Sequence, residues 1–598
     1  MEITRTFDIL DRLNANFKKD DVLSVKRNGN WEKFSTEEYY KTANYLSYGL
    51  LALGIKKGDK VASVSNNRPE WNFLDMGISQ IGAVHVPVYP TISVEEYEHI
   101  LEHSDARIIF MSDKALVKKI KPVIEKTPNI ETIYTFNEVE GEKSWTEVVA
   151  LGKENEEKYK EELISLKKNV LPTDLCSIIY TSGTTGLSKG VMLSHRNFIS
   201  NVISGAPALP IDETMKVLSF LPLCHVYERL LTYVFQYKGI SIYYAESMGT
   251  LINDMKEVKP DGFDTVPRLL ERVFDGILAK GKNLKGFKKA IFNASIKVGL
   301  KYEFEGKNGW WYETKRTVLD KLVYTKWRDA LGGNVKFIGS GGAALQPRLA
   351  RVFHAAGINV QEGYGLTETS PLVAFNYYYS GKRKFGTVGT VIDNVEVKIA
   401  EDGEILVRGE NVMLGYYKNP ELTAEVIDEE GWFHTGDVGI FEDGKYLKIT
   451  DRKKEIFKMS SGKYVAPQAI ENKFKESELI EQVMVVGENQ KFASALISPN
   501  FTLLQDFAKK HHIEFSDRQQ LIDHPQILTQ FQKEVNSFNK QLGQTEEIKR
   551  FKIVTDEWTP ESGELSPTLK LKRRFLYKKY NHLLEQIYMP SKNNIIGD

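Results

Sequence analysis

The sequence predicts an α/β protein, with a large N-terminal domain of helix-covered sheets plus a small antiparallel β-containing subdomain, and then a small α+β C-terminal domain. Two observations support this class. Short apolar segments alternate with helical segments through the first two-thirds of the chain, which is typical of parallel sheets covered by helices. From residue 386 the strand signals become antiparallel in character, and after residue 451 a hairpin precedes several helices. We therefore expect domains at residues 1–450 and 451–598.

The expected elements follow in order along the chain. Strands are expected at 61–64, 83–88 and 107–111, helices at 71–81 and 94–103, and a solvated helix or connector at 151–168. A second αβ unit has strands at 175–180, 191–193, 217–221 and 240–244, and its helices begin after Ser194 and near Val266. Sheet resumes at 335–343, short strands follow at 395–399, 403–408 and 446–449, and a hairpin spans 482–498.

Composition excludes several classes of protein. The 598 residues are 41% hydrophobic and 27% charged, which is ordinary for a globular protein. Lys plus Arg equals Asp plus Glu at 80 each, so no bulk charge attracts nucleic acid. The two cysteines, Cys176 and Cys224, lack the spacing of a zinc site or a disulfide framework. No signal peptide or long apolar span is evident, so we expect a cytoplasmic protein without a nucleic-acid partner.

Residues 180–190, with the sequence YTSGTTGLSKG, predict a phosphate-binding loop. Glycines allow backbone N–H groups to face an anion, hydroxyl side chains add donors, and Lys189 adds a positive charge. The loop nearly matches the Walker A pattern, but Ser188 replaces its second glycine and Gly190 replaces its magnesium-binding hydroxyl. A strand at 191–193 also follows where a Walker loop would open a helix. We therefore expect a strand–turn–strand phosphate loop.

Four further segments carry candidate functional side chains. His225 follows the end of a predicted strand, in residues 221–229. Residues 361–369 place Tyr364 as a stacking face and Glu368 as a hard oxygen ligand suited to Mg²⁺. Asp437 follows a turn and is suited to accept hydrogen bonds from a ribose diol. The charged run 451–458 contains the fourth candidate, Arg452.

Together these segments occur in the order and rough spacing of the adenylate-forming superfamily. Within it, the chain most closely resembles the long-chain acyl-CoA synthetases, or fatty acid–CoA ligases. The finer signatures are NRPEW at 67–71, PLCHVYER at 222–229, VPR at 266–268 and PTLKLKRR at 567–574. The resemblance covers about residues 10–585. It implies an enzyme that uses ATP to join a long-chain fatty acid to coenzyme A through an acyl-adenylate, releasing AMP.

The resemblance also implies roles for individual residues. The ATP and AMP contacts are Thr181, Ser182, Gly183, Thr184, Thr185, Gly186, Lys189, Gly341, Gly342, Gly363, Tyr364, Gly365, Thr367, Asp437 and Arg452. The Mg²⁺ contacts are Thr181 and Glu368, and both join Lys570 and His225 as catalytic residues. Lys570 is the C-terminal lysine that balances charge where the carboxylate meets the α-phosphate. Leu569 stands where relatives usually have glycine, so Lys572 is kept as a second candidate.

The implied C-terminal domain is mobile and rotates between the two half-reactions. Lys454 matches the hinge position. After rotation, Lys458 and Gly462 would line the coenzyme A channel, where glycine lets the backbone pass close to a thin ligand. Ser461 replaces a second glycine that many relatives have. The implied small molecules are a fatty acid, ATP, Mg²⁺ and coenzyme A.

Several alternatives stay open at this point. The acyl group could pass to an acyl carrier protein, although the compact spacing from Asp437 to Arg452 argues against the extra segment of such ligases. A non-catalytic acyl or nucleotide sensor on the same fold is a second alternative, and a luciferase-like oxidative fate a third. The basic, Trp-rich segment 281–332 could shape an acyl entrance, form a peripheral membrane contact, or simply pack as a helical insertion. The oligomeric state is open, with a dimer as one possibility.

Overall fold

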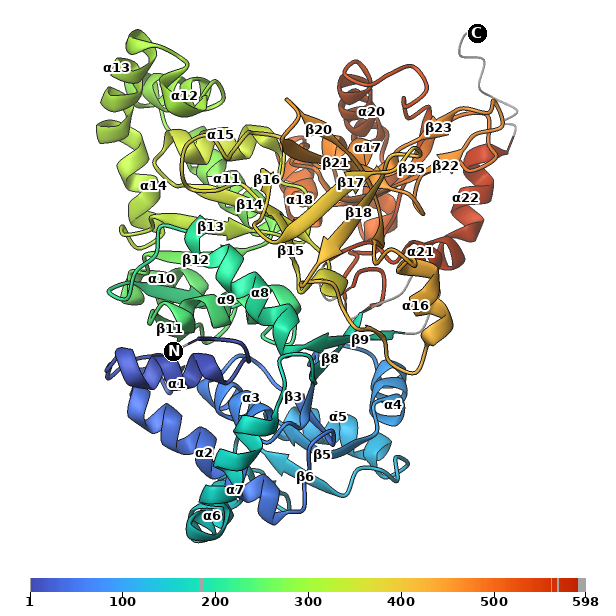
Figure 1. Ribbon diagram of the computed structural model, residues 1–598. Coiled ribbons are helices and arrows are strands. Elements are labelled where there is room, and N and C mark those ends of the chain that lie inside the picture. Colours follow the sequence, from blue (N-terminus) through green and yellow to red (C-terminus); the bar gives the residue numbers. More distant parts are fainter. Residues whose placement is uncertain (1, 182–187, 561, 567–568, 590–598) are drawn as a thin grey trace. The chain divides into compact units, whose positions relative to one another are not determined.

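The computed structural model describes residues 2–181, 188–560, 562–566 and 569–589 (Figure 1). The chain divides into two compact units. The first comprises Met1–Lys398, Leu406–Thr435 and Phe441–Lys448, and the second comprises Ile399–Ile405, Gly436–Ile440 and Ile449–Asp598. Each unit is described below by itself.

A nine-stranded sheet and an eight-stranded sheet form the framework of the first unit. The nine-stranded sheet has, in order, β16 (Thr390–Val391), β15 (Leu372–Phe375), β14 (Val360–Gly365), β13 (Phe337–Ser340), β12 (Gly262–Thr265), β10 (Lys216–Ser219), β11 (Ser241–Tyr244), β1 (Leu23–Arg27) and β2 (Asn30–Phe34). The eight-stranded sheet has β19 (Gly415–Tyr416), β9 (Lys189–Ser194), β8 (Leu175–Thr181), β4 (Val84–Val88), β3 (Lys60–Val64), β5 (Ala106–Met111), β6 (Thr132–Thr135) and β7 (Lys143–Ser144).

The strand pairing confirms the expected class. Strands β14, β13, β12, β10, β11 and β1 run parallel, and the outer pairs β1–β2, β14–β15 and β15–β16 run antiparallel. In the other sheet, β8, β4, β3, β5, β6 and β7 are parallel, whereas β9 pairs antiparallel with both β8 and β19. The β1–β2 hairpin at one edge was not expected from the sequence, because its partner β11 lies about two hundred residues away.

Helices cover these sheets in three layers, which the buried side chains define. Side chains alternate between the two faces of a strand. In β3, Val61 packs in the core that lies between the two sheets. Its neighbour Ala62 packs in a second core with the helices α4 (Val94–His103) and α5 (Lys114–Ile124). In β10, Val217 packs in the shared core and Leu218 in a third core. The helices of the shared core are α1 (Asp8–Asn16), α2 (Thr36–Ala52), α3 (Pro69–Gln80), α6 (Trp145–Glu154), α7 (Glu156–Asn169), α8 (His195–Gly205) and α9 (Val226–Tyr237).

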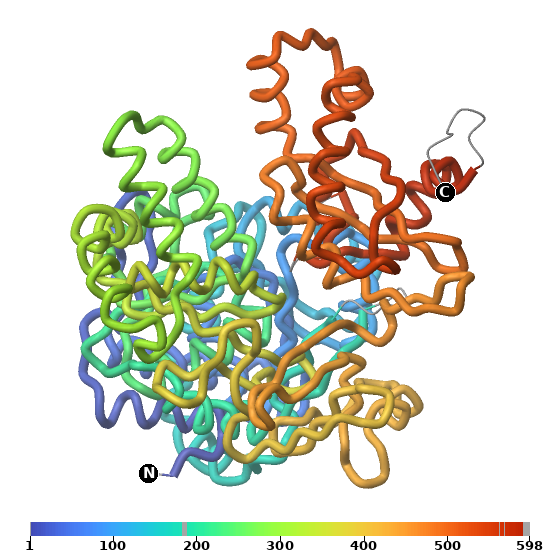
Figure 2. The backbone as a smooth tube through the Cα atoms, turned by 90° about the horizontal axis from the view of Figure 1, so that it is seen from above, coloured from blue at the N-terminus to red at the C-terminus, as the bar shows by residue number. Residues whose placement is uncertain are grey.

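The outer layers hold the remaining helices of the first unit. They are α4 (Val94–His103) and α5 (Lys114–Ile124) on the eight-stranded sheet, and α10 (Leu251–Val258), α11 (Pro267–Lys282), α12 (Gly286–Gly299), α13 (Trp310–Leu319), α14 (Thr325–Ala330) and α15 (Pro347–Ala355) around the third core. α16 (Pro420–Val426) follows β19. Segment 281–332, for which three interpretations were open, is therefore helical, and both views show it at the edge of the first unit (Figures 1 and 2).

Residues 395–452 add a four-stranded sheet in the order β17 (Val395–Ile399), β18 (Glu404–Gly409), β20 (Phe433–Glu442) and β21 (Tyr446–Arg452). The second unit continues with the antiparallel pair β22 (Phe457–Lys458) and β23 (Tyr464–Val465) and with a three-stranded sheet, β24 (Ile480–Val486), β25 (Ser494–Pro499) and β26 (Arg550–Ile553). Its helices are α17 (Pro467–Phe474), α18 (Phe501–Lys510), α19 (Arg518–Asp523), α20 (Pro525–Asn539), α21 (Arg573–Lys579) and α22 (Asn581–Tyr588). The hairpin expected at 482–498 is β24–β25.

No helix in the described part of the chain has both the length and the hydropathy that crossing a bilayer requires. Both cysteines are buried as free thiols, and burial raises the pKa of Cys176 to about 12.

A buried ion pair lies in the shared layer. The Arg229 guanidinium of α9 binds the Asp75 carboxylate of α3, and both side chains are 2% exposed. Asp75 also accepts hydrogen bonds from Tyr233 at 2.6 Å and bonds His85 at 2.7 Å. Burial by itself would raise the pKa of Asp75, but Arg229 and these hydrogen bonds outweigh it and hold that pKa below its ordinary value. Arg229 closes the PLCHVYER signature, so the last residue of that signature has a structural contact.

Substitution Arg229→Met should lower the midpoint of urea unfolding, at a cost of about 3–5 kcal/mol, because Asp75 would keep a buried charge without its partner. The double variant Arg229→Met/Asp75→Leu should recover part of that loss. The matched control Lys41→Met, which breaks an exposed pair with Glu37, should leave stability almost unchanged, because water screens that pair. A loss for Arg229→Met as small as that of the control would contradict the importance assigned to the buried pair.

Candidate functional site

The predicted phosphate loop connects the antiparallel strands β8 and β9. Thr181 ends β8, Lys189 begins β9, and the two residues are paired across the ladder. The expected strands on both sides of the loop are confirmed. After β9, Ser194 caps α8 by accepting a hydrogen bond from Asn197 N–H at 3.2 Å. Residues outside the described ranges include the predicted phosphate contacts Ser182, Gly183, Thr184, Thr185 and Gly186.

Two histidines of α4 hold the described ends of this loop. His99 Nε2 lies 2.8 Å from the Ser188 carbonyl oxygen, and His103 Nδ1 lies 2.8 Å from the Tyr180 hydroxyl. The two rings stack with centroids 5.3 Å apart, because residues four apart on a helix share a face. Sequence reasoning missed both histidines. Their spacing was visible, but nothing in the sequence indicated which strand ends α4 would contact.

Lys189 and Glu368, both predicted site residues, are joined through Tyr416. The Lys189 ammonium lies 5.1 Å from the centre of the Tyr416 ring, and the Tyr416 hydroxyl donates to Glu368 Oε1 at 2.9 Å. Burial and the nearby Glu368 charge raise the pKa of Tyr416, so its hydroxyl keeps the proton that it donates. Sequence reasoning missed Tyr416, which β19 brings beside Val191 of β9.

Strand β14 ends at a close backbone approach that requires glycine. A side-chain carbon on Gly365 would lie 1.6 Å from the Pro371 carbonyl oxygen, so only glycine fits there. On Gly363 the same carbon would lie 3.1 Å from the Phe375 ring. Tyr364, between them, is half-buried. The buried Thr367 and the half-buried Glu368 follow in the short helix Thr367–Thr369. The predicted residues 363–368 therefore form one continuous segment.

The glycines after β13 lie against α9. A side-chain carbon on Gly341 would approach the Tyr227 ring to 3.1 Å, and Gly342 has φ of +80°, a conformation that favours glycine. His225 begins the same helix, where its Nδ1 accepts a hydrogen bond from Tyr227 N–H at 3.1 Å. The contact shown for His225 is thus a helix cap, and its predicted catalytic role stays a prediction.

Three buried carboxyl groups lie on β12, α9 and β14; they belong to Asp264, Glu228 and Glu362. Burial raises the pKa of Asp264 and of Glu228, and the nearby Glu228 carboxyl group raises the pKa of Asp264 further. Glu228 Oε1 accepts a hydrogen bond from the Ser219 hydroxyl at 2.5 Å. Burial also raises the pKa of Glu362, on β14, to about 8. Near neutral pH the Glu362 carboxyl group therefore keeps a proton that it can donate.

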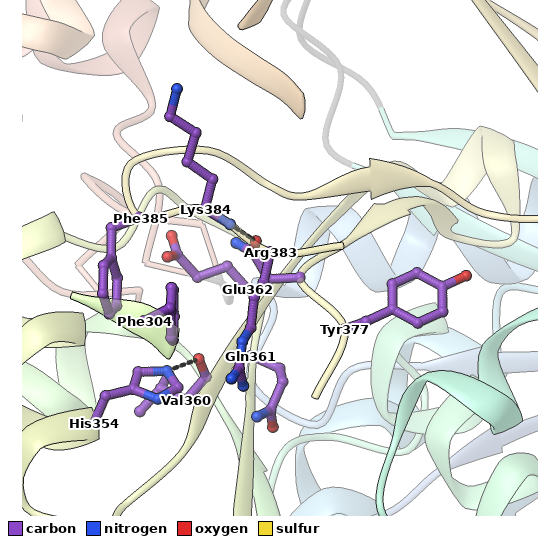
Figure 3. A pocket seen from close by; sticks show the side chains of 10 residues that line it. Phe304, His354, Val360, Gln361, Glu362, Tyr377, Arg383, Lys384 and Phe385 are labelled. Atoms are coloured by element: carbon purple, nitrogen blue, oxygen red, sulfur yellow. Dashed lines mark hydrogen bonds between the residues drawn. The ribbon is translucent and has the colours of Figure 1, made fainter. Parts of the chain in front are cut away.

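Glu362 lies in a small pocket beside the Gly363–Gly365 segment (Figure 3). The rings of Phe304 and Phe385 stack there with centroids 3.9 Å apart, and the Arg383 guanidinium lies 4.4 Å from the centre of the Phe304 ring. The lining residues are Phe304, His354, Val360, Gln361, Glu362, Asn376, Tyr377, Arg383, Lys384 and Phe385. The two rings therefore cover each other, and a pocket of this size holds about one water molecule at most.

In the second unit, the structure brings together the two predicted ribose contacts. Asp437 of β20 forms an ion pair with Arg452 of β21, with Oδ1 and Nε 2.9 Å apart. Asp437 is 4% exposed, so its position is fixed by its surroundings. The predicted hinge residue Lys454 is exposed and lies two residues after the end of β21.

The predicted coenzyme A channel residues lie in the β22–β23 hairpin of the second unit. Lys458 pairs with Tyr464 across the hairpin. Met459 N–H donates to the Lys463 carbonyl oxygen at 2.9 Å, and Gly462 has φ of +82°, which the tight turn requires. The turn itself therefore requires Gly462, independently of any ligand that binds beside it.

Lys570 follows a short turn in the second unit. The Lys570 carbonyl oxygen accepts from Ser566 N–H at 2.8 Å, and Lys570 N–H donates to the Ser566 hydroxyl at 3.1 Å. Leu569 has φ of +60°, in the left-handed region. Glycine adopts this conformation freely, and this chain keeps it with leucine. Lys572 N–H donates to the Glu564 carbonyl oxygen at 2.8 Å.

Comparisons with curated proteins give full-length relatives. The chain is 31% identical to the long-chain-fatty-acid–CoA ligase FadD15 of Mycobacterium bovis over 566 residues, 94% of this chain and 93% of the relative. It is 31% identical to long chain acyl-CoA synthetase 6, peroxisomal, of Arabidopsis thaliana over 577 residues, 91% of this chain and 79% of the relative. It is 32% identical to the long-chain-fatty-acid–CoA ligase 5 of Rattus norvegicus over 600 residues, 94% and 85% of the two chains.

Solved structures show the same fold at lower identity. The anthranilate CoA ligase AuaEII in complex with anthranoyl-AMP has a TM-score of 0.69 at 17% identity, covering 96% of this chain and 97% of the other. The adenylation domain of a carboxylate reductase from Mycobacterium chelonae has a TM-score of 0.74 at 22% identity, covering 98% and 91%. These likenesses establish the fold that the sequence predicted.

Two family models account for most of the chain. The model of the C-terminal domain of AMP-binding enzymes matches residues 454–592, and the model described as AMP-binding enzyme matches residues 11–417. With a match over more than half of its length, the chain belongs to the family of AMP-binding enzymes.

Proposed function

We propose that this protein is a long-chain fatty acid–CoA ligase that forms AMP. A carboxylate oxygen of the fatty acid attacks the α-phosphorus of ATP and pyrophosphate leaves. The sulfur of coenzyme A, having lost its proton, then attacks the acyl carbon of the adenylate and AMP leaves. The observation that carries this proposal is the 31–32% identity, over nearly the whole chain, to relatives named as such ligases.

The Lys189–Tyr416–Glu368 cluster supports the ATP end of this reaction. We infer that Lys189 binds the departing phosphates and that the Tyr416 hydroxyl fixes the orientation of the Glu368 carboxylate. Among the described residues no group of three or more His, Cys, Asp or Glu side chains could hold a metal alone. One carboxylate from Glu368 and one hydroxyl from Thr181 fit Mg²⁺, which keeps waters and phosphate oxygens as its other ligands. When bound, Mg²⁺ would neutralise charge on pyrophosphate.

The remaining predicted residues take the following proposed roles. The glycine segments 341–342 and 363–365 leave the backbone open beside Tyr364, where adenine would bind, and the protonated Glu362 carboxyl group could donate to a ring nitrogen. Thr367 supports the same segment, and Asp437 with Arg452 would bind the ribose. Lys570 would balance the charge of the carboxylate and the α-phosphate, Lys454 would act as the hinge, and Lys458 with Gly462 would line the coenzyme A channel. His225, at the start of α9, would be a catalytic residue.

The buried free cysteines support a cytoplasmic location, because reducing compartments keep such thiols unpaired. We propose residues 1–450 and 451–598 as the functional domains, with rotation of the second between the half-reactions. A peripheral membrane contact would use the exposed part of segment 281–332.

Incubation with ATP, Mg²⁺ and fatty acids of C6 to C20, with and without coenzyme A, tests the reaction itself. We expect AMP and an acyl thioester to accumulate in equal amounts when coenzyme A is present, with the longer acids turned over fastest. Liquid chromatography with mass spectrometry separates the products. Adenylate that accumulates while no thioester forms would overturn the ligase proposal in favour of another acyl acceptor, and no consumption of any acid would favour a sensor.

Substitution Lys570→Ala should slow acyl-adenylate formation by about 10²–10³, because one preorganised charge is lost from the transition state. Thioester formation from supplied acyl-adenylate should be nearly unchanged, since that step proceeds in the other domain orientation. Single-turnover assays of each half-reaction measure the two rates. Lys572→Ala is the matched control, and a larger effect of Lys572→Ala on adenylation would move the role to that lysine.

Substitution Tyr416→Phe should reduce kcat/KM for ATP by about tenfold or more, because Glu368 loses its charge-assisted hydrogen bond. It should also raise the Mg²⁺ concentration needed for half-maximal rate. The neighbour Tyr417 donates to Asp105 at 2.8 Å, so Tyr417→Phe removes one hydroxyl outside the cluster and serves as the control. Equal effects of the two variants would show that Tyr416 acts only through stability.

A further inference from the structure

We propose that one face of the helical segment 310–330 docks on an anionic lipid surface. This segment is a continuous helical run made of α13 (Trp310–Leu319), the π-helical turn Asp320–Tyr324 and α14 (Thr325–Ala330). Its inner face is buried in the third core through Leu319, Val323, Tyr324 and Trp327. The outer face is the subject of the proposal, and Figure 1 shows α13 at the edge of the first unit.

The outer face carries large apolar side chains in one stripe. Trp311 is 71% exposed, Val318 is 53% exposed and Leu322 is 47% exposed. Lys315 lies between Trp311 and Val318, and the resulting spacings of four, three and four residues keep these side chains on one helix face. Trp310, 68% exposed, packs its ring edge-on against Trp311 with centroids 4.3 Å apart. Two adjacent tryptophans at this exposure indicate a surface that another apolar phase covers.

The charges of this helical run are segregated. Lys315, Lys321 and Lys326 are exposed on the outer side. Glu313 is instead paired with Arg316 at 2.8 Å, and Asp320 with Arg328 at 2.6 Å. The exposed acid of the run is Asp329, near its end. Over residues 281–332 there are twelve basic and five acidic residues, so the surroundings are basic as well.

The polar groups of the outer face lose little when water is removed. The hydroxyl groups of Thr314, Thr317 and Thr325 donate to carbonyl oxygens of their own helix, at 3.0, 2.9 and 2.9 Å. A hydroxyl that is already bonded does not need water at an interface. Lysine side chains can also extend their charged ends toward lipid headgroups while their methylene groups stay in the apolar layer.

These features together identify the partner by its chemistry. Tryptophan side chains favour the region where headgroups meet acyl chains, and lysines bind anionic headgroups. The proposal goes beyond the ligase reaction and does not depend on it, because lipid binding can be measured without ATP, fatty acid or coenzyme A.

Co-sedimentation of the full chain with vesicles tests the proposal. The vesicles are phosphatidylcholine alone and an equal mixture of phosphatidylcholine and phosphatidylglycerol. We expect binding to the mixed vesicles, weaker binding to the neutral ones, and loss of binding at high salt, which screens the lysines. No binding to either vesicle, or equal binding to both, would overturn the proposal.

Two sets of variants locate the contact. Trp310→Ser/Trp311→Ser should weaken binding about tenfold or more, because interfacial affinity scales with buried apolar area. Its control, Ile164→Ser/Leu171→Ser, changes two exposed apolar side chains on and after α7 and should leave binding unchanged. Lys315→Gln/Lys321→Gln/Lys326→Gln should weaken binding about fivefold for each lysine. The control Lys153→Gln/Lys160→Gln/Lys168→Gln removes the same amount of charge from another part of the surface and should leave binding unchanged.

Circular dichroism of each variant establishes that the fold is kept, so that a loss of vesicle binding reports on the surface itself. Controls that weaken binding as much as the test variants would overturn the location. Sedimentation velocity without lipid tests whether a second copy of the chain covers this face instead. If the protein is a dimer that Trp310→Ser/Trp311→Ser converts to a monomer, a second copy covers the face and the lipid-docking proposal is overturned.

Discussion

The structure of the first unit depends on the ion pair between Asp75 and Arg229. These charges lie in the layer between the two sheets, where each compensates the other for the water lost on burial. The pair joins α3 to α9, and the hydrogen bond from Arg229 to the Ser177 hydroxyl extends the contact to β8. α9 in turn places Tyr227 against Gly341, and β8 ends at Thr181 beside the phosphate loop. Elements that contribute to the candidate site from both sheets are thus fixed by one buried electrostatic contact.

Local patterns predicted the class of fold and most of the strands that bear site residues. The strand after Lys189 and the cap at Ser194 could be predicted because a short apolar run and a capping residue are local signals. Tyr416 and His103 could not be assigned in this way. Each contacts the site from a segment far away in sequence, and a lone tyrosine or histidine carries no signal of its partner. The edge hairpin β1–β2 was missed for the same reason, since β11 pairs with it across about two hundred residues.

The tryptophans of segment 281–332 lie in two different environments, one buried and one exposed. The three tryptophans were equally consistent with packing and with exposure when only their identity was known. The helix phase separates them: Trp327 is 7% exposed, whereas Trp310 and Trp311 face outward. Glu313 and Asp320 are each paired with an arginine. The charges that determine the electrostatic field of the outer face are therefore those of the lysines. Sequence counts of charge could not show this, since they weigh paired and unpaired groups alike.

The turn before Lys570 illustrates a difference from the usual pattern of the family. A leucine with φ of +60° is held in a conformation that costs about 1 kcal/mol or more, which glycine would adopt freely. Glycine, however, would also leave the unfolded chain and any open form of the loop with many more accessible conformations. Leucine limits that freedom, and the Ser566 contacts hold the folded turn. The lysine therefore projects from a backbone with few alternatives, so that a displacement of this lysine would require larger parts of the chain to move.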